Sequence, residues 1–121
     1  MPKLLIVDDE IDIREFAKKF FSKRHINVFI ASGGGEALQL IENERPDLVL
    51  LDINMEQMNG IEVLKRLREK KDTTRVIMVT GVNAENVVKE ISDLGIEGYI
   101  HKPLILEELQ NIVMAKLEIN K

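Results

Sequence analysis

The chain has 121 residues, the length of a single domain, and 45% of them are hydrophobic while 31% are charged, which excludes a disordered or fibrous chain. It has no cysteine, which excludes disulfides, thiol nucleophiles and zinc sites built on thiolates. The formal net charge of -4 has the wrong sign for a protein whose main partner is a phosphate backbone, so we expect no direct nucleic-acid binding.

The first residues predict a chain without a targeting segment. Met1-Pro2-Lys3 leads directly into four apolar residues, and acids follow them at once. This apolar stretch is too short for a signal peptide and far too short to cross a bilayer. We therefore expect a cytoplasmic protein that makes no membrane contact.

Short apolar runs rich in β-branched residues alternate with helical patterns along the whole chain. We predict the strands at residues 3–7, 27–31, 48–51, 76–79 and 99–100. The apolar residues at helical spacing that predict five helices lie within residues 13–20, 37–41, 61–67, 87–94 and 106–117. Five strand-then-helix repeats favour parallel strands with right-handed crossovers, which is the α/β class with a doubly wound sheet.

Local signals mark the ends of two of these helices. Asp12 and Glu15 have the spacing of a capping box at the start of the first helix. On the same helix, Phe16 falls on the apolar face together with Ile13 and Phe20. Gly95 is in position to end the fourth helix.

Polar residues gather where the predicted strands end. Asp8 and Asp9 follow the first strand, Asp52 the third, Thr80 the fourth and Lys102 the fifth. In a doubly wound sheet these ends share one edge, and ligands bind beyond it. Three carboxylates on one edge repel one another unless a cation relieves them, so we expect a hard divalent ion there, namely Mg²⁺.

An ammonium group and a hydroxyl beside such an ion suit a phosphoryl group with charged oxygens. Lys102 would supply the positive charge and Thr80 the hydroxyl donor. Asp52 is then the expected nucleophile, forming an aspartyl phosphate. Each residue alone is weak evidence, because acids that follow a strand more often cap the next helix, so the prediction depends on their combination.

The motifs that carry these residues resemble the receiver domain of two-component response regulators, over essentially the whole chain. In chain order they are Leu5-Ile6-Val7-Asp8-Asp9-Glu10, Asp47-Leu48-Val49-Leu50-Leu51-Asp52, Met55 with Met58-Asn59-Gly60, Val79-Thr80-Gly81, and Gly95 with Tyr99-Ile100-His101-Lys102-Pro103. The resemblance implies one receiver domain over residues 1–121. It also implies a flavodoxin-like fold with five helices and five parallel strands in the order 2-1-3-4-5.

The same resemblance implies a ligand set for the metal. Asp9 would bind Mg²⁺ directly and Asp8 through water, while Asn54 would offer its backbone carbonyl. Asp52 would contact the ion and accept the phosphoryl group from the phosphohistidine of a sensor histidine kinase or a phosphotransfer protein. The chain would then catalyse only its own phosphorylation and dephosphorylation, as a phosphoacceptor and not as an enzyme acting on other substrates.

The resemblance also implies which residues respond to phosphorylation and which surface passes on the signal. Thr80 and Lys102 would hold the phosphoryl oxygens, and Tyr99 would reorient as Thr80 moves. The bond between Lys102 and Pro103 would be cis. The signal would leave through the fourth helix, the fifth strand and the fifth helix, to a downstream protein or by self-association.

The sequence departs from the family pattern at several positions. Glu56 stands where proline is usual, Ile96 replaces a small residue, and Gly33 and Gly35 flank the expected glycine of the second helix. Ile105 stands where a polar cap of the last helix is usual. An exposed isoleucine there would suit a partner contact, and the alternative is that it belongs to the core.

Two other classes of function use a similar set of residues. An aspartate-nucleophile phosphatase usually carries a second acid two residues after the nucleophile, whereas position 54 is Asn. An interaction domain that works without phosphorylation usually loses an acid, the threonine or the lysine, and here all are present. The sequence therefore favours a phosphorylation-dependent signalling switch over both.

Overall fold

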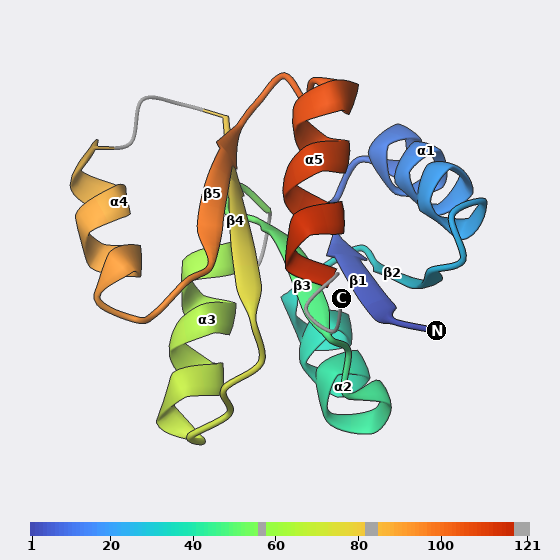
Figure 1. Ribbon diagram of the computed structural model, residues 1–121. Helices are drawn as coiled ribbons and strands as arrows, with labels where there is room; N and C mark the ends of the chain where they lie inside the picture. The colour runs from blue at the N-terminus through green and yellow to red at the C-terminus, as the bar shows by residue number, and fades with distance from the viewer. Residues whose placement is uncertain (56–57, 82–84, 118–121) are drawn as a thin grey trace.

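The computed structural model describes residues 1–55, 58–81 and 85–117, so the substitution at Glu56 lies outside the described residues. Its centre is a five-stranded, wholly parallel sheet in the order β2-β1-β3-β4-β5 (Figure 1). The strands are β1 (Lys3–Val7), β2 (Asn27–Ala31), β3 (Leu48–Asp52), β4 (Val76–Thr80) and β5 (Gly98–His101). The helices are α1 (Ile11–Ser22), α2 (Gly34–Glu44), α3 (Gly60–Glu69), α4 (Glu85–Ser92) and α5 (Leu106–Leu117). The predicted fold class, strand order and helix number are confirmed.

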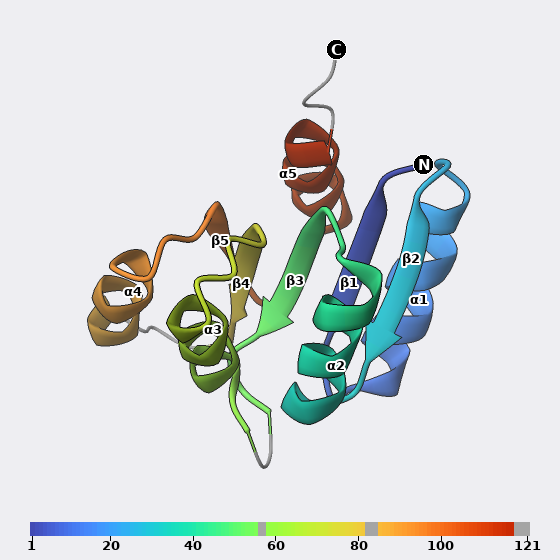
Figure 2. The same cartoon turned by 90° about the horizontal axis from the view of Figure 1, so that it is seen from below.

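The helices cover both faces of the sheet and form two separate cores. Helices α2, α3 and α4 pack on one face, and α1 and α5 pack on the other (Figure 2). Successive side chains of a strand point to opposite faces, so Leu5 and Val7 of β1 belong to the first core and Leu4 and Ile6 to the second. Burial on both sides explains the unbroken apolar runs of the central strands, such as Leu48–Leu51 of β3.

The start of α1 differs from the prediction. Glu10 is its N-cap residue and makes no side-chain capping hydrogen bond. Asp12 and Glu15 lie inside the helix, so the predicted capping box is wrong. Because the helix begins at Ile11, directly after the acids, the turn between β1 and α1 is very short and carries Asp8, Asp9 and Glu10 close together.

Arg68 attaches the end of α4 to α3. Its guanidinium donates hydrogen bonds to the carbonyl oxygens of Leu94 at 2.8 Å and Gly95 at 2.8 Å, both just after α4. A second attachment is the ion pair between Lys65 of α3 and Glu90 of α4, at 2.5 Å. Gly95 has a φ of +78°, a conformation that favours glycine, so it ends this helical segment as the sequence predicts.

Candidate functional site

The carboxyl ends of the strands bring the predicted polar residues together at one edge of the sheet. Asp52 ends β3 and pairs in register with Val79, and Thr80 ends β4 beside His101 of β5. Asp8, Asp52 and Thr80 are the buried polar or charged side chains among the residues described, with exposed fractions of 3%, 1% and 1%. Polar groups so deeply buried at a ligand-binding edge indicate a functional site.

Lys102 links these acids. Its Nζ lies 3.2 Å from Oδ2 of Asp52, 3.3 Å from Oδ2 of Asp8 and 3.6 Å from Oε1 of Glu10. The backbone amide of Lys102 donates to the carbonyl oxygen of Thr80 at 2.7 Å, and the peptide bond between Lys102 and Pro103 is cis. The end of β4 and the turn after β5 thus place this ammonium group against the carboxylates.

Backbone amides hold the other oxygen of each buried carboxylate. The amide of Glu10 donates to Oδ1 of Asp8 at 2.9 Å, and the amide of Asn54 donates to Oδ1 of Asp52 at 3.1 Å. Each carboxylate therefore has one oxygen fixed by its own turn and one oxygen facing Lys102. These contacts restrict the rotamers of both acids.

Close packing against the end of β3 explains why position 60 of the motif is a glycine. A Cβ atom at this position would clash with the backbone carbonyl of Asp52. The first turn of α3 can therefore lie directly against the end of β3, where the amide of Gly60 donates to the carbonyl oxygen of Ile53 at 3.0 Å. This close approach holds the backbone that carries Asp52.

Negative charge is in excess at this edge. Burial raises the pKa of the Asp8 carboxyl, and this effect outweighs the hydrogen bond from Glu10 and the attraction of Lys102. Burial, together with the charge of Asp8, also raises the pKa of Asp52. Burial alone would lower the pKa of Lys102, but the attraction of Asp52 and Asp8 is larger and raises it. One ammonium does not neutralise these acids, so a further cation would be favoured.

The donor set fits a hard divalent ion. Carboxylate oxygens of Asp8, Asp9 and Glu10 lie within 4.8 Å of one another, and Asp9 and Glu10 are exposed where Asp8 is buried. Oxygen ligands with access to water are what Mg²⁺ prefers. Glu10 is the residue that sequence reasoning did not assign to the site; its place directly after two acids was the available signal.

A cleft beside Asp9 gives access to this edge. It has a volume of about 650 Å³ and lies between the start of α2 and the segment before α3. Its lining residues are Asp9, Ser32, Gly33, Gly34, Gly35, Glu36, Met55, Met58 and Glu62. A Cβ atom on Gly34 would come within 2.8 Å of Sδ of Met58 and would displace that side chain, whereas a Cβ atom on Gly33 or Gly35 would meet nothing within 4 Å.

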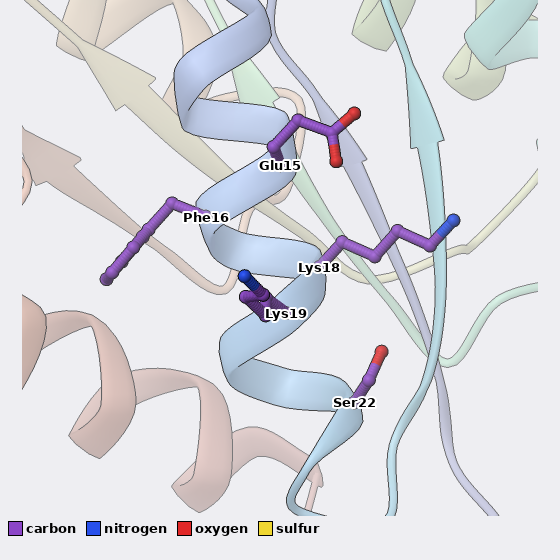
Figure 3. A pocket seen from close by; sticks show the side chains of 5 residues that line it. All are labelled: Glu15, Phe16, Lys18, Lys19 and Ser22. Atoms are coloured by element: carbon purple, nitrogen blue, oxygen red, sulfur yellow. The ribbon is translucent and has the colours of Figure 1, made fainter.

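A second hollow, of about 530 Å³, lies on α1 (Figure 3). Its lining residues are Glu15, Phe16, Lys18, Lys19 and Ser22, all from this one helix. Phe16 points away from Glu15 and Lys18 and is 50% exposed, so the apolar face that the spacing predicts for this helix is not fully buried. Its ring stacks on that of Phe20, with centroids 6.1 Å apart. No residue of the predicted site borders this hollow.

The remaining predicted residues lie at the rim. Tyr99 on β5 is 42% exposed, and its ring meets His101 edge-on with centroids 5.4 Å apart. Ile105, directly before α5, is 54% exposed, whereas Leu104 packs against the core beneath α1 and α5. The alternative that Ile105 is a core residue is therefore wrong. The other departure, Ile96, is partly buried against the core on the α3 side, which gives its apolar side chain a structural role.

Two curated relatives are similar to this chain. Sporulation initiation phosphotransferase F of Bacillus subtilis (strain 168) is 37% identical over 115 residues, covering 95% of this chain and 93% of the relative. Response regulator MprA of Mycobacterium sp. (strain KMS) is 36% identical over 107 residues, covering 88% of this chain. The matched region is 46% of MprA, so this chain spans about half the length of that relative.

Two solved structures share the fold. The receiver domain of the Francisella response regulator 1452 superposes with a TM-score of 0.90 at 31% identity, covering all of both chains. Response regulator protein TrrA of Thermotoga maritima, solved in complex with Mg²⁺-BeF, gives a TM-score of 0.83 at 32% identity, covering 97% of this chain and 100% of that one.

The family model of the response regulator receiver domain matches residues 4–114. Receiver domains are phosphoacceptor switches of two-component systems that bind Mg²⁺ at an acidic pocket and interact with histidine kinases or phosphotransfer proteins. No helix within the described residues is long and apolar enough to cross a membrane. With its acidic edge, its parallel sheet and these matches, the chain belongs to the receiver-domain family of two-component response regulators.

Proposed function

We propose that Asp52 is the phosphoacceptor and that the phosphoryl group comes from a histidine kinase or a phosphotransfer protein in the presence of Mg²⁺. The observation that carries the proposal is the position of Lys102, whose Nζ lies 3.2 Å from buried Asp52 and 3.3 Å from buried Asp8. An ammonium group at that place faces both the nucleophile and the acids expected at the metal. In this proposal residues 1–121 act as one receiver domain.

Each residue of the edge has a distinct role in the transfer. The carboxylate of Asp52 attacks the phosphorus of the phosphohistidine, so an O–P bond forms while the N–P bond breaks and the imidazole keeps the electron pair. Lys102 and Thr80 hold the phosphoryl oxygens, where a positive charge and a hydroxyl donor stabilise the charge that develops. Hydrolysis of the acyl phosphate by water at the same site returns the domain to its resting state.

The metal ligands in this proposal come from the turn after β1 and from the end of β3. Asp9 would hold Mg²⁺ directly, Asp8 would hold it through water, and Asp52 and the backbone carbonyl of Asn54 would complete the set. When bound, the ion supplies positive charge that offsets the phosphoryl oxygens and the clustered acids. The exposed position of Asp9 and the raised pKa values of Asp8 and Asp52 support a site that favours an added cation.

The wild-type protein should take up one phosphoryl group from a small phosphodonor only when Mg²⁺ is present. Intact-mass spectrometry should show one added group, which is retained in mild acid and released in base, as expected for an acyl phosphate. A chelator should prevent the labelling, and added Mg²⁺ in excess should restore it. Labelling that is unaffected by the chelator would contradict the proposed chemistry.

We further propose that the signal leaves through the face formed by α4, β5 and α5. Thr80 neighbours His101 in the sheet, and the ring of His101 contacts that of Tyr99, so a movement of Thr80 has a short path to an exposed aromatic residue. Ile105 and Leu106 are exposed apolar residues at the start of α5. Exposed apolar groups with charged neighbours are typical of recognition surfaces.

Ile105→Asp should weaken the response to phosphorylation without reducing the labelling of Asp52. The reason is that a charge on this apolar side chain would have to be desolvated in a contact with a downstream protein or a second copy. Light scattering and pull-down, each with the phosphorylated and unphosphorylated protein, measure the response. Phe16→Asp is the matched control, because Phe16 is an equally exposed apolar residue on α1. If Ile105→Asp behaves as this control does, the output surface lies elsewhere.

A further inference from the structure

Arg14 binds the backbone between the two acids expected at the metal. Its Nη1 donates a hydrogen bond to the carbonyl oxygen of Asp8 at 2.8 Å. That carbonyl belongs to the peptide unit that joins Asp8 to Asp9. From this contact we propose that Arg14 is a positioning residue for the Mg²⁺ ligands, an inference that rests on the proposed function.

Other hydrogen bonds hold the backbone of the turn after β1 on either side of the peptide unit that Arg14 contacts. The amide of Asp8 donates to the carbonyl oxygen of Ala31 at 3.1 Å, and the amide of Arg14 donates to the carbonyl oxygen of Glu10 at 3.2 Å. These bonds fix the two ends of the turn. Inside the turn, Oδ1 of Asp8 holds the amide of Glu10, which follows Asp9, and the side chain of Arg14 holds the peptide unit that directly precedes Asp9.

Asp9 is the ligand that depends most on this support. Asp8 is buried, and its carboxylate is held by the amide of Glu10 and by Lys102, whereas Asp9 is exposed. The place of an exposed side chain is set mainly by the backbone that carries it. Groups that hold a metal ligand in position typically change metal affinity by about 10- to 100-fold when they are removed.

The rival explanation is that Arg14 acts only through its positive charge. A cation near the acids opposes the binding of another cation, so removing the charge alone would tighten Mg²⁺ binding. Removing a positioning group would weaken it. The two explanations therefore predict changes of opposite sign for the same variant.

The experiment compares Arg14→Met with Arg24→Met. Arg24 lies just after the same helix, and its Nη1 also donates to a backbone carbonyl, that of Phe20, at 2.9 Å. Both variants lose one positive charge and one hydrogen bond from a guanidinium to the backbone. The dissociation constant for Mg²⁺ is measured from amide chemical shifts in an NMR titration, and thermal melts without metal record the stability of each variant.

We expect Arg14→Met to raise the dissociation constant for Mg²⁺ about tenfold, the lower end of the range for such supporting groups. Arg24→Met should leave it unchanged within the error of the titration. Arg14→Lys keeps the charge and a donor of similar reach, so it should recover part of the lost affinity. If Arg14→Met does not fold, Arg14→Gln replaces it in the same comparison, with the same expected direction.

Two results would overturn the inference: equal or tighter Mg²⁺ binding by the neutral Arg14 variant, or equal weakening by the Arg14 and Arg24 variants. Both leave the proposed function standing, provided that the wild-type protein binds Mg²⁺ and is labelled. A wild-type protein that neither binds Mg²⁺ nor accepts a phosphoryl group would instead remove the proposed function, and the inference with it.

Discussion

Asp52→Asn should abolish phosphoryl labelling by a small phosphodonor with Mg²⁺. An amide oxygen carries no negative charge and is a poor nucleophile, so no acyl phosphate can form at this position. Intact-mass spectrometry measures the labelled fraction, which should fall to the level seen with chelator. Asp93→Asn is the control, because Asp93 is exposed and lies away from the sheet edge, after α4. Undiminished labelling of Asp52→Asn would place the phosphoacceptor on another residue.

The same variant should be more stable than the wild type when metal is absent, which separates lost chemistry from lost folding. Burial raises the pKa of Asp52 in the folded state above its value of 3.8 in the unfolded chain. Such a group lowers the free energy of unfolding as the pH rises from the unfolded pKa through the folded one. Near neutral pH the variant should therefore have the higher free energy of unfolding, because it no longer buries a charged carboxylate at this position.

Urea denaturation in chelator at several pH values measures this gain. It should be largest near neutral pH and should vanish near pH 3, where Asp52 is protonated in both the folded and the unfolded wild type. A variant that is less stable at neutral pH would show that Lys102 and the amide of Asn54 stabilise the Asp52 carboxylate by more than its burial costs.

The fold was predictable largely because the three central strands, β1, β3 and β4, are buried on both faces. Runs such as Leu48–Leu51 are apolar without interruption, and each ends where a polar residue begins, so both the strand and its functional end are visible in the sequence. The regular spacing of strands and helices then fixes the class of the fold. The strand order came from the family resemblance instead, because periodicity within a segment does not show which strands are neighbours.

Details set by tertiary packing were not predictable. The capping box at Asp12 and Glu15 is wrong because α1 starts two residues earlier than the apolar spacing indicates. Phe16 is half exposed because it lies at the border of the apolar face, where spacing alone cannot separate buried from exposed positions. The support that Arg14 gives to Asp8 depends on the angle between β1 and α1, which no local pattern encodes.

The sequence shows the acids of the site, because they follow predicted strands. It does not show that the ammonium group of Lys102 contacts three of them. Three distances below 4 Å from one ammonium group to Asp52, Asp8 and Glu10 depend on how the turn after β5 meets β1 and β3. Residues far apart in sequence meet there only because the parallel strands end at one edge. Because one ammonium group contacts several acids, we expect a large effect when Lys102 is replaced.

Lys102→Ala should tighten Mg²⁺ binding and at the same time slow phosphoryl labelling by about 100-fold or more. The ammonium group competes with an added cation for Asp8 and Asp52, so its removal leaves more negative charge for the metal. During transfer the same group stabilises the charge on the phosphoryl oxygens, and losing one such donor typically costs about 10²- to 10³-fold in rate.

Two measurements on one variant test this prediction: the Mg²⁺ dissociation constant from an NMR titration, and the labelling rate from intact mass with saturating Mg²⁺. The matched control is Lys116→Ala, which removes a partly exposed lysine of α5 whose Nζ lies 3.6 Å from Oε1 of Glu97. This control should change neither quantity. Opposite changes in Lys102→Ala cannot arise from partial unfolding, because an unfolded fraction would weaken metal binding and labelling together. If the variant is labelled at the wild-type rate, Lys102 belongs to the resting charge balance of the edge and takes no part in the transfer.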